Sequence, residues 1–96
     1  MAIIAERLLG ADRNALLRLL ASMIGEFTID GRGAFIARDL DGLFSANEAI
    51  HRLSGHMRDL TDPQEPFTES RAEVILACLA MLRPKTLARL EAHCPF

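Results

Sequence analysis

The sequence predicts an all-α fold: a single small domain of five or six short helices packed around a buried helix near residues 70–82. Apolar residues recur at three- and four-residue spacing in most of the chain, which is typical of amphipathic helices. The length of 96 residues allows one hydrophobic core, so residues 1–96 form one domain. The composition, 50% hydrophobic and 25% charged, is that of an ordinary globular protein and excludes a disordered chain.

Two helices are predicted in the first third of the chain. Ile4 and Leu8 lie four residues apart, which favours a short helix over residues 2–9 that Gly10 can end. Asp12 can cap a second, amphipathic helix that extends to Phe27. The apolar side of this second helix consists of Leu16, Leu17, Leu19, Leu20, Met23, Ile24 and Phe27.

The region 26–44 allows three interpretations. A β-hairpin would place Phe27 opposite Ile36 across the four-residue loop 30–33. A connecting turn at the glycines would be followed by a helix, because Ile36, Leu40 and Phe44 recur at helical spacing. We expect this helix to cover residues 34–44.

The third interpretation is a degenerate metal-binding loop. The twelve residues that begin at Thr28 resemble the calcium loop of the EF-hand family, with Gly33 at the sharp turn and with Asp30 and Asp39 at the third and twelfth positions. Thr28 replaces the first carboxylate and Arg32 places a cation at the fifth ligand position. We therefore expect no useful calcium binding, and we interpret the segment as a glycine turn between two helices.

The remaining helix signals lie in the chain from Ser45 onward. Ser45 and Glu48 have the spacing of a capping box, which predicts a helix over residues 46–60 that Pro63 terminates. Thr68 or Ser70 can cap the next helix, and every residue from 74 to 82 is apolar, so this helix should be the most buried. Pro84 suits the first position of a last short helix.

One exposed histidine is a candidate phosphoacceptor. His51 lies opposite the apolar side of the helix predicted over residues 46–60, near Ser54, Gly55 and Arg58. Residues 51–55 resemble the His-X-Leu-Lys-Gly pattern of histidine phosphotransfer domains, with Ser54 in place of the lysine. The resemblance implies that His51 would carry the phosphoryl group, that Gly55 would make room for a receiver domain, and that Arg58 could supply the missing cation. The alternative interpretation is that His51 is a solvated surface histidine.

The sequence gives little support for nucleic-acid binding, metal binding or a reactive thiol. Eleven Lys and Arg against thirteen Asp and Glu leave no basic surface typical of nucleic-acid binding. Arg83, Lys85 and Arg89 form a local excess of positive charge, which keeps a small DNA-binding helical regulator as an alternative. We expect no metal site and no cofactor. Cys78 lies in an apolar segment, where burial should raise its pKa and leave it inert.

By elimination, we expect a small non-enzymatic helical protein that acts through protein–protein contact, as a homodimer or with another protein. The apolar residues of segment 74–82 should outnumber the positions that one neighbouring layer can cover. Leu76 and Leu79 are therefore the predicted contact patch, with Ile75 and Leu82 as the alternative pair. No apolar stretch approaches the roughly 18 residues of a membrane span, and two cysteines in unlike settings do not form a disulfide framework, so we expect a cytoplasmic location without membrane contact.

Overall fold

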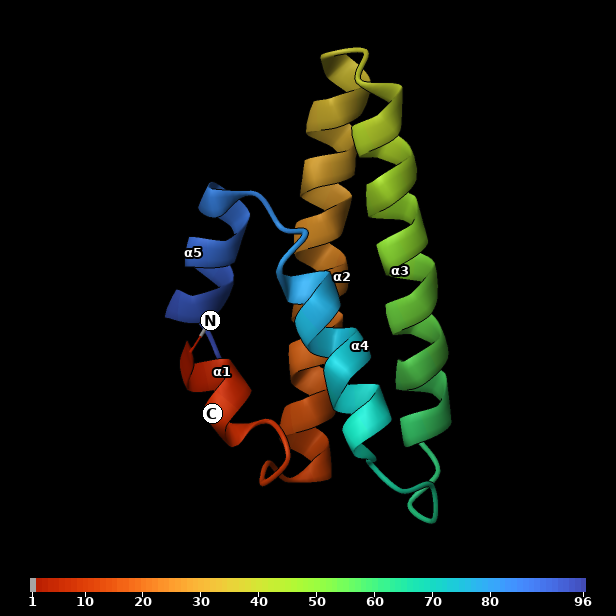
Figure 1. The fold of residues 1–96 in the computed structure, drawn as a ribbon, viewed down its shortest axis with the longest axis vertical. Coiled ribbons are helices and arrows are strands. Elements are labelled where there is room, and N and C mark those ends of the chain that lie inside the picture. The colour runs from red at the N-terminus through yellow and green to blue at the C-terminus, as the bar shows by residue number, and fades with distance from the viewer. Residues whose placement is uncertain (1) are drawn as a thin grey trace.

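Two long helices form an antiparallel hairpin, and three shorter helices pack against its lower part in the computed structural model, which describes residues 2–96 (Figure 1). The described residues contain no strand, so the all-α prediction is confirmed. None of their helices combines the length and the apolar character that crossing a bilayer requires. The helices are α1 (Ala2–Arg7), α2 (Arg13–Ile36), α3 (Leu40–Leu60), α4 (Glu69–Leu79) and α5 (Pro84–Ala92).

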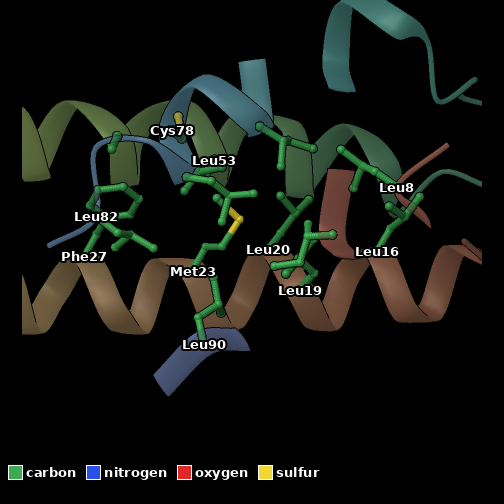
Figure 2. Close-up of a cluster of buried hydrophobic side chains, with 14 of the residues drawn as sticks. Leu8, Leu16, Leu19, Leu20, Met23, Phe27, Leu53, Cys78, Leu82 and Leu90 are labelled. Atoms are coloured by element: carbon green, nitrogen blue, oxygen red, sulfur yellow. The ribbon is translucent and has the colours of Figure 1, made fainter. Parts of the chain in front are cut away.

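The core lies along the inner side of α2. Met23 and Phe27 of α2 meet Leu53 of α3 and Leu82, which follows α4, while Leu90 reaches α2 from α5 (Figure 2). All five side chains are at most 6% exposed. Helix α2 therefore packs against α3, against α5 and against the segment that follows α4.

Helix α4 is buried on one side only. The buried helix predicted near residues 70–82 corresponds to α4 and the turn after it, with Ile75, Leu79 and Leu82 in the core. Ala77 is exposed and Met81 is 48% exposed, so the opposite side has no cover. The other helices thus pack around α2 rather than around α4, because α2 is twice as long and spans the whole domain.

The region 26–44 differs from all three interpretations of the sequence. Helix α2 continues without a break through Ile36, which excludes both the β-hairpin and the EF-hand-like loop. The helix predicted over residues 34–44 is wrong as well, since residues 37–39 form a turn and reverse the chain. Asp39 caps α3 by accepting a hydrogen bond from the Gly42 amide at 3.0 Å, and α3 starts at Leu40, six residues before the predicted start.

Candidate functional site

Four large apolar side chains are exposed where α2 ends and α3 begins. Phe35 and Ile36 on α2 are 68% and 74% exposed, and Leu40 and Phe44 on α3 are 62% and 63% exposed. We call these four residues the tip patch. An apolar cluster of this kind on a small domain is typical of a surface that contacts another molecule.

Small residues and the half-buried Leu43 form the contact between the two helices at this end. A Cβ atom built on Gly31 would lie 3.4 Å from the Cβ of Ala46, and one built on Gly42 would lie 3.2 Å from the Cβ of Ala34. Ala34 and Ala46 are buried, and so is Gly31. The two backbones approach closely at these small residues. The large apolar residues of the tip therefore lie on the outside of the hairpin.

The tip extends beyond the other helices. Figure 1 shows the yellow turn between α2 and α3 above the ends of α4 and α5, with no third layer beside it. Farther down the hairpin, α4 and α5 cover the large apolar side chains of the core (Figure 2). At the tip, Phe35, Ile36, Arg38 and Leu40 line an open depression of about 520 Å³. The tip patch is thus left without cover by the chain itself.

The turn at the tip holds an arginine in a strained conformation. The amide of Asp39 donates to the Ala34 carbonyl at 2.8 Å and the amide of Arg38 donates to the Phe35 carbonyl at 3.1 Å, which is the Schellman pattern of a helix end. This pattern requires a left-handed residue, and Arg38 adopts it with φ at 59°. Glycine is the usual residue here because a side chain in this conformation costs about 1–2 kcal/mol.

Charges of both signs surround the tip patch. Arg32, Arg38 and Asp41 are exposed, and none of them forms an ion pair with any other residue in the range 2–96. Asp39 lies 3.7 Å from Arg83, which follows α4. The rim of the tip patch therefore carries two cations and one carboxylate without an ion pair inside the described residues.

The structure removes Leu79 from the predicted contact patch, whereas Leu76 stays a prediction. Leu79 is fully buried, and Leu76 is half-buried against the same core. The long hairpin provides a wider surface for α4 than a set of short helices would, so Leu79 finds its cover within the chain. Four of the exposed large apolar side chains lie at the hairpin tip, and Leu9, Ile29 and Met81 are exposed outside the tip patch.

His51 has open space around it. It is exposed on the outer side of α3, as are Ser54 and Arg58. A Cβ atom built on Gly55 would meet no atom within 4 Å. The neighbouring Arg52 is paired with Glu48 at 2.8 Å and so is not a free cation for a phosphoryl group. Phosphotransfer at His51 remains a prediction from the sequence.

The other candidate residues have structural roles. Within residues 2–96, no group of three or more His, Cys, Asp or Glu side chains is arranged to hold a metal ion. Burial raises the pKa of the Cys78 thiol, as predicted. Arg89 is paired with Glu26 at 2.7 Å, so part of the positive charge around α5 is offset within the fold.

A cluster of polar side chains joins α3 to α4. Arg71 lies 2.8 Å from Nδ1 of His56 and forms ion pairs with Asp59 at 3.2 Å and Glu65 at 2.6 Å. Because Arg71 can only donate, Nδ1 of His56 must be the unprotonated acceptor. Burial, reinforced by the Arg71 cation and opposed by Asp59, lowers the pKa of His56 below its ordinary value of 6.5.

This cluster predicts a loss of stability in mild acid. The unfolded chain takes up a proton on His56 as the pH falls through 6.5, whereas the folded chain does so only at lower pH. The free energy of unfolding should therefore decrease as the pH falls below that value. Urea titrations at about pH 7.5 and about pH 5.5 measure the loss, and His56→Gln should reduce it because glutamine stays neutral. An equal loss in both proteins would contradict this assignment.

Comparison of the chain with models of known protein families, with curated proteins and with solved structures found no match.

Proposed function

We propose that this chain is a non-enzymatic interaction domain that binds protein through the tip patch. The observation that carries the proposal is that four large apolar residues at the tip are 62–74% exposed, while small residues and Leu43 occupy the helix contact. A tip that only needed to be stable would place the large residues inside, because burial of such a side chain contributes about 1.5–3 kcal/mol. The tip patch gains this stabilisation only when another molecule covers it.

The long hairpin supports the same proposal. Its lower part is held by the core, which fixes the direction of both helices, and the tip is carried on these helices beyond α4 and α5 (Figure 1). A surface on rigid helices loses little conformational entropy when it binds.

Site-specific photo-crosslinking in cells of the native host tests the proposal. A photoreactive phenylalanine analogue replaces Phe35, and the matched control places it at Leu9, which is 57% exposed and lies outside the tip patch. We expect a defined protein adduct at position 35 that is absent at position 9. The identified protein is then purified, and Phe44→Glu should weaken its binding at least about tenfold. Identical products at both positions, or a partner that binds Phe44→Glu equally well, would reject the proposal.

A further inference from the structure

We propose that the protein bound at the tip is a second copy of this chain, and that two hairpin tips pack antiparallel about a two-fold axis. This inference rests on the proposed function and names its partner. In such a dimer, the second hairpin supplies the layer that is missing beyond α4 and α5, so that the two tips together form a four-helix bundle. A two-fold contact uses the same surface on both copies and closes without forming filaments.

The size of the patch matches what a stable dimer needs. Four large apolar side chains, each between 62% and 74% exposed, present about 500 Å² of apolar surface, since a large aromatic side chain can bury about 150–250 Å². A standard interface buries about 800 Å² on each partner, including a polar rim. The rim here is provided by Arg32, Arg38 and Asp41. The total surface of 5976 Å² is large enough to supply such a contact from one end of the molecule.

The charges of the rim favour a self-complementary partner. An anionic membrane or a strongly acidic protein would favour a rim of one sign, whereas here unpaired Arg38 lies close in sequence to unpaired Asp41. In an antiparallel pair of tips, the turn of one copy lies against the first turn of α3 in the other. Arg38 then faces Asp41 of the second copy, and the two-fold axis makes this pair occur twice.

The strained turn supports a role for the Arg38 side chain. Glycine would relieve the left-handed conformation at φ 59°, and nothing within residues 2–96 forms an ion pair with the guanidinium in compensation. The two hydrogen bonds of the turn hold Arg38 in this conformation, and non-glycine residues held in this way cluster at functional sites. A carboxylate from a second copy would supply the missing contact.

Sedimentation equilibrium over about 1–500 μM measures the dimer and the surface that forms it. The wild-type mass should rise from 10.6 kDa toward twice that value with concentration. We expect Phe44→Glu to raise the dissociation constant at least about a hundredfold, because it buries a charge in the contact, while Leu9→Glu leaves it within about threefold. Circular dichroism shows that each variant is folded.

Charge reversal tests the pairing of Arg38 with Asp41. Arg38→Asp and Asp41→Arg each place like charges at both copies of the contact, so each variant alone should dimerise at least about tenfold more weakly. An equimolar mixture restores both pairs, because one copy then carries only carboxylates and the other only guanidinium groups. The mixture should therefore dimerise about as tightly as the wild type. Failure of the mixture to do so overturns the pairing.

Two other results would overturn the inference as a whole. A mass that stays at 10.6 kDa at every concentration excludes a second copy as the partner. A dimer that Phe44→Glu does not weaken places the contact elsewhere on the molecule. Neither result decides the proposed function, because a crosslinked protein of another kind at position 35 would still support it.

Discussion

Replacing Leu79 by Glu is expected to unfold the protein. Leu79 is fully buried in the core, where no described side chain is placed to pair with a new carboxylate. Loss of a buried leucine side chain costs about 2–5 kcal/mol, and an unpaired buried charge costs several kcal/mol more. A domain of this size has a total stability of about 5–15 kcal/mol, so the sum reaches a large part or all of it.

Far-UV circular dichroism and urea unfolding measure this effect. Met81→Glu is the matched control, since Met81 lies two residues away, after the end of α4, and is 48% exposed. We expect the control to change the free energy of unfolding by less than about 1 kcal/mol. A folded, soluble Leu79→Glu monomer with an unchanged unfolding midpoint would show that Leu79 lies at the surface. The sequence pattern predicted this position.

The glycines of α2 explain why the long helix was not predicted. Gly31 and Gly33 follow Asp30, and this combination is typical of a turn, since each glycine inside a helix costs up to about 1 kcal/mol. The structure offsets this cost by packing Gly31 against Ala46. That contact joins two segments far apart in the sequence, so local propensity does not contain it. Small residues at helical spacing on both sides of the turn were the available signal.

The sequence predicted only part of the candidate site. The helical spacing of Ile36, Leu40 and Phe44 predicted one helix over residues 34–44, whereas the chain reverses between Ile36 and Leu40. A single helix would have directed these residues toward one core. The Schellman turn at Arg38 instead divides them between two helix ends and leaves them exposed, and a left-handed arginine has no signature in the sequence.

Asp30 was interpreted as a possible calcium ligand, and its position in the structure predicts a different role. Its Oδ2 accepts hydrogen bonds from the Arg83 amide at 3.1 Å and from the Thr86 hydroxyl at 3.0 Å. Arg83 is the N-cap of α5 and forms no capping bond with its own side chain. A carboxylate from α2 thus caps a helix that lies more than fifty residues later in the chain. The negative charge also favours the N-terminal end of the helix dipole.

Asp30→Ala should therefore destabilise the domain by about 2 kcal/mol, because it removes the cap and a charge-assisted hydrogen bond together. Thr86 keeps a second acceptor, the Arg83 carbonyl at 3.0 Å, so its buried hydroxyl is not left without a partner. Urea unfolding measures the loss, and amide hydrogen exchange should show that α5 loses protection before α2 does. Glu73→Ala, an exposed carboxylate on α4, is the control and should stay within about 0.5 kcal/mol of the wild type. If both variants unfold at the same urea concentration, Asp30 does not hold α5 in place.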